Sequence, residues 1–404
     1  MTIQIRTIRE DEFEEVVRVV ETAFAEVATP EVVENERRVA EIDRCLAALD
    51  EGRIVAGAAA YSLRLSVPGG EVSAAGVTSV GVLPTHRRRG INTALMRRML
   101  DDARGRGEPI AALYASEGGI YGRFGFGLAS FLCWIDLETE RSAFVRGYRP
   151  AGRVELHRKA DAIPRMLEVY ESVRATRPGM PAIDPRWVEY RLHDHGPERE
   201  VEPFFAVHET GGTADGYAVY KVHHEWPGSM PHLELTVSDL MATSPQAYAE
   251  TWRFVLDIDL VHRVKAWGRP VDEPLLHLLA EPRRLRLTLR DGLWIRLVDV
   301  PAALTARGYV GQGRVVVEVR DRFCPWNDGR FVLEADAGGS SCSPTDAEPE
   351  LACDVNALGA AYLGGATFRQ LWRAGQVEER RAGALARADA LFAWDPAPWC
   401  PFVF

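Results

Sequence analysis

The sequence lacks long apolar runs. No run approaches the roughly 20 apolar residues that a bilayer-spanning helix needs, and the segment Met1–Arg6 contains no apolar signal-peptide core. Paired Cys-x-x-Cys motifs are also absent, because the six cysteines are scattered singly along the chain; this excludes a zinc ribbon and a thioredoxin motif. Such cysteines are typical of buried thiols in a reducing compartment, so we expect a cytoplasmic protein with no membrane span and no metal.

Positive charge is scarce. The 48 Lys and Arg residues face 58 Asp and Glu residues, which gives a formal net charge of −10. Phosphate binding needs a basic field, so nucleic acid is disfavoured as a main partner, whereas a cationic substrate is compatible with the balance. At 404 residues the chain exceeds the size at which single cores stop growing, about 250–300 residues. We therefore expect two or three domains.

The first part of the chain combines strand and helix patterns. Phe13, Val16 and Val20 recur at helical spacing after an acidic first turn. The predicted strands are 2–8, 45–49, 54–67, 73–83, 110–115 and 126–137, and the predicted helices are 9–24, 31–42, 91–104 and 119–124. The block is thus a mixed sheet with flanking helices, closed by the strand at 126–137.

A second block repeats this order. Its strand at 233–241 enters a helix at 245–256, just as the strand at 77–83 leads to the helix at 91. The connecting residues Met241–Ser244 contain neither the glycine nor the arginines of the first block. We interpret the second block as a degenerate copy of the first.

A third block follows from about residue 291. Strands are predicted at 315–320 and 330–335, helices at 355–362, 367–374 and 384–393, and an exposed Gly- and Ser-rich loop at 336–350. The pattern also breaks at 146–152. We therefore expect an α/β (α+β) protein with domains at 1–148, 149–290 and 291–404.

The junction between residues 77 and 95 carries the clearest chemistry. A strand ends, Arg87, Arg88 and Arg89 precede Gly90, and a helix begins at Ile91. Free backbone N–H groups and the dipole at a helix start bind a diphosphate, and glycine lets the backbone approach closely. The alternative is a solvated basic turn. The Walker motif and G-x-G-x-x-G are both absent, which argues against nucleoside triphosphate and dinucleotide sites.

This segment resembles the [Q/R]-x-x-G-x-[G/A] loop of the GCN5-related N-acetyltransferases (GNAT fold). The resemblance implies that acetyl-CoA is the co-substrate, held by Arg87, Arg88, Arg89, Gly90, Ile91, Asn92 and Thr93. It further implies that backbone groups of Val80, Gly81 and Val82 pair with the pantetheine arm and polarise the thioester carbonyl. Asn92 departs from the family pattern, which usually has Gly or Ala there.

Tyr121 is the candidate general acid. Acetylation of an amine needs an acid that protonates the departing thiolate, and the pKa of a tyrosine, near 10, stays above that of a thiol. Tyr121–Phe126 resembles the Tyr-x-x-x-Gly-Phe segment of the same family, whose tyrosine sits beside the thioester sulfur. The alternative makes Tyr121 a core aromatic with a satisfied hydroxyl.

The whole chain resembles the Eis (enhanced intracellular survival) acetyltransferases, which have tandem GNAT domains and a C-terminal domain like sterol carrier protein type 2. The most specific parts are Ser116–Gly125 and the terminal Phe404. The resemblance implies that the α-carboxylate of Phe404 is the general base and that Ser116 and Glu117 line the cofactor side. It also suggests Phe24 and Glu26 as substrate-binding residues, although a core Phe24 and a solvated Glu26 remain equally open.

The same resemblance implies amine substrates on aminoglycosides and lysine side chains, a link to antibiotic resistance, and a homohexamer. The alternative function is a CoA- or lipid-binding regulatory protein without catalysis, in which the third block could carry lipid. An intact loop and Tyr121 argue against that alternative.

Overall fold

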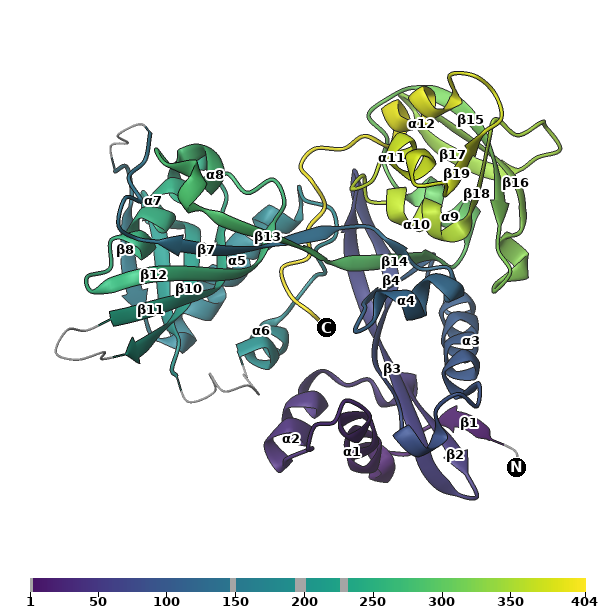
Figure 1. The fold of residues 1–404 in the computed structure, drawn as a ribbon, viewed down its shortest axis with the longest axis horizontal. Coiled ribbons are helices and arrows are strands. Elements are labelled where there is room, and N and C mark those ends of the chain that lie inside the picture. The colour runs from purple at the N-terminus through teal and green to yellow at the C-terminus, as the bar shows by residue number, and fades with distance from the viewer. Residues whose placement is uncertain (1–2, 146–149, 193–200, 226–231) are drawn as a thin grey trace. The chain divides into compact units, whose positions relative to one another are not determined.

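The computed structural model describes residues 3–145, 150–192, 201–225 and 232–404. They form two compact units: unit 1 comprises Met1–Ser130, Gly292–Pro398 and Val403–Phe404, and unit 2 comprises Phe131–Asp291 and Trp399–Phe402. These units contain three β-sheets with helices beside them: unit 1 holds two of the sheets and unit 2 holds one (Figure 1). The boundary expected at residue 148 lies outside the described residues.

The first sheet of unit 1 has the order β1-β2-β3-β4-β5-β14-β6. Its strands are β1 (Gln4–Thr7), β2 (Cys45–Asp50), β3 (Arg53–Val67), β4 (Gly70–Val82), β5 (Ile110–Tyr114), β6 (Gly127–Leu128) and β14 (Leu293–Leu297). Only β4 and β5 pair in parallel, through the crossover helix α3 (Ile91–Gly105). A parallel pair requires such a crossover, which places the β4–α3 connection at one end of the sheet.

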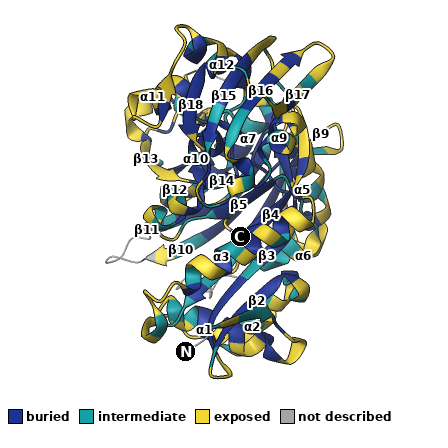
Figure 2. Ribbon diagram, turned by 90° about the vertical axis from the view of Figure 1, so that its right-hand side faces the viewer, coloured by how far each residue is buried: buried dark blue, intermediate teal, exposed yellow. Residues whose placement is uncertain are grey.

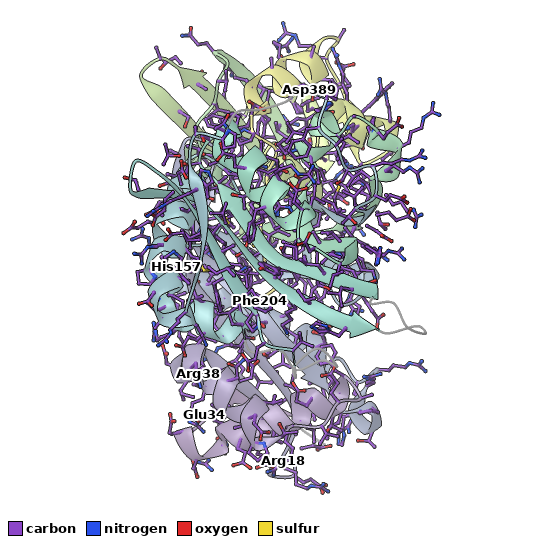
Figure 3. The ribbon with its side chains drawn as sticks, turned by 90° about the vertical axis from the view of Figure 1, so that its left-hand side faces the viewer. Arg18, Glu34, Arg38, His157, Phe204 and Asp389 are labelled. Atoms are coloured by element: carbon purple, nitrogen blue, oxygen red, sulfur yellow. The ribbon has the colours of Figure 1, made fainter. Side chains whose placement is uncertain are left out.

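Helices α1 (Phe13–Ala23) and α2 (Pro30–Val39) precede β2. The apolar face of α1, with Phe13 and Val16, is buried. Glycine permits this packing, because a Cβ added at Gly57 would lie 2.8 Å from Cγ1 of Val16. The strands are largely buried (Figure 2), and Arg18 and Glu34 project outward from α1 and α2 (Figure 3).

The sheet of unit 2 has the order β13-β7-β12-β11-β10-β9-β8. Its strands are β7 (Phe131–Glu138), β8 (Arg153–His157), β9 (Phe204–Thr210), β10 (Thr213–Glu225), β11 (His232–Ala242), β12 (Val261–Pro270) and β13 (Arg286–Asp291). Its helices are α5 (Lys159–Arg174), α6 (Pro185–Leu192), α7 (Pro245–Leu256) and α8 (Leu275–Leu278). The parallel pair β11–β12 is connected through α7, so the predicted repetition of the first block is present.

One strand prediction needs correction. The segment 126–137 was expected to complete the first block as one strand, but it breaks at Ser130, and β7 pairs with β12 and β13. The place beside β5 is taken by β14, which follows β13 after one residue. A strand pattern specifies which residues extend, but not which sheet they join.

The third sheet belongs to unit 1 and has the order β17-β16-β15-β18-β19. Its strands are β15 (Gly313–Arg320), β16 (Gly329–Asp336), β17 (Gly339–Pro344), β18 (Leu351–Asp354) and β19 (Val377–Glu379). The helices beside it are α9 (Val300–Ala306), α10 (Val355–Ala361), α11 (Phe368–Arg373) and α12 (Ala384–Phe392). The loop predicted at 336–350 is wrong for β17, because pairing with β16 overrides the weak strand propensity of Gly and Ser.

Short helical turns complete the described elements. They are α4 (Gly118–Tyr121) and 3-10 turns at Glu10–Glu12, Ile42–Arg44, Pro84–His86, Gly122–Phe124, Pro282–Arg284 and Pro325–Asn327. None of the helices in the described part of the chain is long and apolar enough to cross a membrane.

Candidate active site

The strands β4 and β5 separate at one end of the first sheet. Their parallel pairing runs from Ala74 to Gly76. Beyond it, Ser79 has a positive φ of 50°, and the register between β3 and β4 shifts at the same point. Such a bulge bends the strand and re-aims the following residues, so Val80–Val82 leave the ladder with β5 and open a cleft.

A cavity of about 520 Å³ occupies this cleft within unit 1. It is lined by Ala23, Phe24, Val80, Gly81, Val82, His86, Arg87, Arg88, Gly90, Ile91, Asn92, Thr93, Ser116, Glu117, Ile120, Tyr121 and Arg123. The structure thus brings together most of the site residues expected from sequence. The lining does not include Arg89, Glu26 or Phe404.

Four lining residues were not among the expected site residues: Ala23, His86, Ile120 and Arg123. His86 and Arg123 belong to the same two motifs as Arg87 and Tyr121, so neighbouring positions in the sequence carried that signal. Nothing in the sequence pattern pointed to Ala23, which ends α1 far from both motifs.

The helix α3 begins in a way that leaves its first amides free. Gly90 is the N-cap residue, with φ of 80° in the left-handed region and no side-chain cap. The first helical bond is from Ala94 N to Gly90 O, so the amides of Ile91, Asn92 and Thr93 are not used within the helix. Free N–H groups at the positive end of a helix form an anion site.

The three loop arginines have different partners. Arg87 donates to the Ala23 carbonyl at 2.6 Å, which ties the loop to the end of α1. Arg89 forms an ion pair with Asp50 at 3.0 Å. Arg88 adopts a φ of 63°, lines the cavity and has no acceptor among the described residues. Arg88 is therefore the loop cation that is available to an anion.

Tyr121 lines the cavity from the short helix α4. Its side chain is buried, and its ring contacts Phe126 edge-on, with centroids 6.1 Å apart. Burial raises the pKa of the phenol and the charge of Glu117 adds to this, while a hydrogen bond with Ser116 partly offsets the rise. The phenol therefore keeps its proton at neutral pH, as a general acid must.

The terminal residue Phe404 is buried in unit 1, with 6% of its surface exposed. Its ring meets Tyr114, the last residue of β5, edge-on at 5.7 Å. A Cβ added at Gly76, where β4 leaves β5, would lie 3.3 Å from the same ring. Phe404 thus packs where the two strands separate, although it is not part of the cavity wall.

A second, smaller cavity next to β4 is lined by acidic side chains. Glu21, Glu36 and Glu41 line a smaller cavity of about 70 Å³ that also contains Ser79. Burial, followed by the negative charges of Glu26 and Glu36, raises the pKa of Glu21 to about 7. Glu21 and Glu36 were missed from sequence, because an acidic helix face usually reads as solvated. Phe24 lines the larger cavity and is 46% exposed.

No group of three His, Cys, Asp or Glu side chains in the described part of the chain could hold a metal ion. His223 lies in β10, and its Nε2 is 3.3 Å from Oγ1 of Thr236 on the neighbouring strand β11.

Three family models match the chain. An acetyltransferase (GNAT) domain matches residues 4–129, a second acetyltransferase (GNAT) domain matches 179–297, and a sterol carrier protein domain matches 300–401. The GNAT fold implies acetyl-CoA as the co-substrate, and the free amides at the start of α3 fit a diphosphate.

Relatives match the full length. The N-acetyltransferase Eis of Mycobacterium tuberculosis is 35% identical over 426 residues, and an uncharacterized N-acetyltransferase of Streptomyces avermitilis is 42% identical over 412 residues; each match covers 100% of both chains. Among solved structures, Eis1 of Mycobacterium abscessus has a TM-score of 0.87 at 37% identity, and the match covers 100% of each chain. From full-length identity and from all three domain matches, this chain belongs to the Eis family and is an N-acetyltransferase with two GNAT domains and a sterol-carrier-protein-like C-terminal domain.

Proposed function

We propose that this enzyme transfers the acetyl group of acetyl-CoA directly to amines of polycationic substrates, such as aminoglycosides or lysine side chains. The observation that carries the proposal is a single cavity that contains both the free amides at the start of α3 and the buried phenol of Tyr121. Transfer from a diphosphate-bearing thioester requires both an anion site and a proton donor.

In this proposal the amides of Ile91, Asn92 and Thr93, with the guanidinium of Arg88, bind the diphosphate. Val80–Val82 have left the ladder with β5, so their backbone groups can pair with the pantetheine arm and polarise the thioester carbonyl. Ser116 and Glu117 line the same side. The burial of Tyr121 supports its role, because an acid in a water-poor wall delivers its proton to the sulfur rather than to solvent.

The proposed reaction is a direct transfer of the acetyl group from the thioester sulfur to the amine nitrogen. The neutral amine nitrogen attacks the acetyl carbonyl carbon, a C–N bond forms and the C–S bond breaks. Tyr121 gives its phenolic proton to the departing sulfur, and the amine nitrogen loses one proton to the α-carboxylate of Phe404. The position of Phe404 where β4 and β5 separate supports that assignment.

The acidic residues support a cationic acceptor. Glu21 lines the smaller cavity together with Ser79 of β4, the strand whose Val80 lines the donor cavity, and the negative charges of Glu26 and Glu36 act on it. Their mutual repulsion is relieved when ammonium groups bind among them. Phe24, which is exposed, adds an aromatic ring to the wall of the donor cavity next to Ala23.

The test is an amine panel assayed by release of free thiol from acetyl-CoA, with aminoglycosides, a lysine peptide and neutral amines as acceptors. We expect turnover with the polycations and less with the neutral amines. Tight binding of acetyl-CoA without thiol release on any amine would instead favour the non-catalytic binding protein. Thiol release with no preference for polycations would contradict the acceptor class alone.

Three further properties belong to the proposal. We propose a homohexamer, checked by the mass of the purified protein in solution. We propose a cytoplasmic location, supported by six free, buried cysteines.

Expression in a sensitive bacterium should raise aminoglycoside resistance if these antibiotics are accepted, and unchanged sensitivity would argue against that substrate.

A further inference from the structure

The turn that carries Tyr121 is packed tightly by residues far away in the sequence. Gly125 has a φ of 88°, and a Cβ added there would lie 2.4 Å from Nη1 of Arg296 and 2.7 Å from its Cζ. The turn is closed by hydrogen bonds from Gly125 N to Gly122 O and from Phe126 N to Tyr121 O. The guanidinium of Arg296, on β14, therefore lies directly against the turn that begins at Tyr121.

Arg296 is fully buried and is held from the other side by the third block. Its Nη2 donates to Oδ2 of Asp321 at 2.5 Å. Asp321 is itself fixed, since it accepts from the amides of Phe323 and Cys324 and from Nδ2 of Asn327. The carboxylate and the guanidinium thus form a rigid support that ends at Gly125.

This arrangement leaves polar atoms unsatisfied. Among the described residues, Nε and Nη1 of Arg296 have no oxygen acceptor, although the guanidinium also interacts with the Cys324 thiol. A buried unsatisfied donor is costly, and an apolar side chain of similar length would avoid that cost. Arg296 thus contacts Gly125 through Nη1 as well as Asp321 through Nη2, so it connects the turn to Asp321.

We propose that Arg296, held by Asp321, is a positioning residue that fixes the turn and so aims the phenol of Tyr121 at the thioester sulfur. The third block then contributes to acetyl transfer by supporting the acid. The inference rests on the proposed function in one respect, namely that Tyr121 is the acid.

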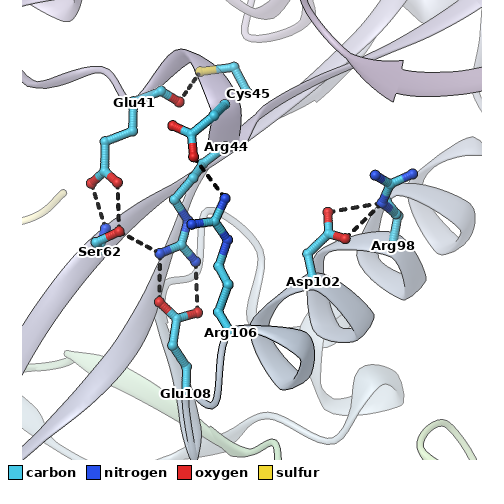
Figure 4. Close-up of polar contacts among 9 residues, drawn as sticks. Glu41, Arg44, Cys45, Ser62, Arg98, Asp102, Arg106 and Glu108 are labelled. Carbon is cyan, nitrogen blue, oxygen red and sulfur yellow. Dashed lines mark hydrogen bonds and ion pairs between the residues drawn. The ribbon is translucent and has the colours of Figure 1, made fainter.

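The first test compares two buried arginines of unit 1. Arg296→Met removes the support, whereas Arg44→Met breaks the pair of Arg44 with Glu108, whose hydrogen bonds are 2.6 and 2.7 Å long (Figure 4). Neither Arg44 nor Glu108 lines the cavity. At a temperature where both variants are folded by circular dichroism, Arg296→Met should lose about tenfold or more in kcat, with KM for acetyl-CoA unchanged. Arg44→Met should keep its kcat within about twofold. Equal losses in both variants would overturn the inference.

The second test is a double-mutant cycle with Tyr121→Phe. If Arg296 acts through the phenol, Arg296→Met should cost almost nothing in the Tyr121→Phe background, because the acid is already absent. The same fold-loss in both backgrounds would show a merely structural role and overturn the inference. Full activity of Tyr121→Phe itself would instead refute the proposed function, so the two failures are distinguishable.

A third variant covers the case in which Arg296→Met does not fold. Gly125→Ala places a methyl group against the guanidinium, while Gly107→Ala strains a similar left-handed glycine, with φ of 73°, whose Cβ site is open. We expect kcat to fall in Gly125→Ala and to stay near wild type in Gly107→Ala. Unchanged kcat in Gly125→Ala would overturn the inference.

Discussion

The two acetyltransferase copies connect a parallel strand pair through a helix in the same way, yet their connections differ in what they offer a ligand. In the first copy Gly90 caps α3 with no side chain, and three amides stay free. In the second copy Ser244 caps α7 and accepts from Ala247 N at 3.1 Å, while Pro245 at the first helical position has no N–H. The helix start that leaves its amides free in one copy is thus capped by its own residues in the other.

The cavities differ in the same sense. The second copy has a cavity of about 410 Å³ beside Met241 and Ala242, but its wall is largely apolar and includes Trp399. Trp399 is buried, and its Nε1 donates to the Gly268 carbonyl at 2.6 Å. Arg269 donates to the Leu240 carbonyl at 2.6 Å, so side chains of unit 2 occupy the place where β11 and β12 separate. A shared topology therefore does not imply a shared site, because a few residues at the helix start decide it.

The largest effect should come from the proposed acid Tyr121 on α4, since the short helix α8 of the second copy contains no tyrosine. Tyr121→Phe keeps the ring contact with Phe126 but removes the transferable proton. We expect kcat to fall about 10²- to 10⁴-fold with little change in KM for acetyl-CoA, measured by thiol release. A kcat within a few-fold of wild type would remove Tyr121 from the mechanism.

The next effect concerns the left-handed N-cap. Gly90→Val forces a β-branched residue to a φ of 80°, which should distort the free amides and raise KM for acetyl-CoA about tenfold. Gly212→Val is the matched control, since Gly212 has a φ of 85° in the β9–β10 hairpin of unit 2 and an open Cβ site. Equal KM values in the two variants would mean that the helix start does not bind the donor.

Substitutions of Arg88 and of Arg89 should have smaller effects on KM for acetyl-CoA, and the two effects should differ. Arg88→Ala removes the loop cation that faces the cavity, so KM for acetyl-CoA should rise about three- to tenfold. Arg89→Ala breaks a partly exposed pair with Asp50 and should change KM less than about twofold. The reverse order, found in a steady-state titration of acetyl-CoA, would contradict the partners described for the loop.

The smallest effect concerns pH. The pKa of Glu21 is raised to about 7, so its carboxylate is charged only above that pH. KM for a polycationic amine should fall about two- to fivefold as pH rises from 6 to 8, and this dependence should be absent in Glu21→Gln.

The raised pKa of Glu21 also predicts how the stability of the folded protein depends on pH. A carboxyl whose folded pKa lies above its unfolded pKa favours the folded state at low pH, and this contribution is lost as pH rises through 7. Glu21→Gln should therefore raise Tm slightly at pH 8 and leave it unchanged at pH 4. A higher Tm at pH 4 alone would show that the sign is wrong.

The cavity-lining positions of the loop and of Tyr121 could be predicted from sequence because each lies in a local motif. A strand, a glycine and a helix start lie within a few residues of Gly90, and Tyr121 lies in a compact motif. The exchange of β7 and β14 between sheets could not be predicted, because strand patterns do not encode partners. The separate roles of Arg88 and Arg89 depend on Asp50 from β2. The raised pKa of Glu21 depends first on burial and then on the charges of Glu26 and of Glu36 from another helix.

The central claim is that one of the two copies binds the acetyl donor and aims it at Tyr121. A crystal structure of the full chain with coenzyme A tests it most directly. The account predicts one molecule per chain, with its diphosphate on the amides of Ile91–Thr93 and its sulfur within about 4 Å of the Tyr121 hydroxyl. A molecule bound at the β11–α7 connection, or a sulfur remote from Tyr121, would contradict the account.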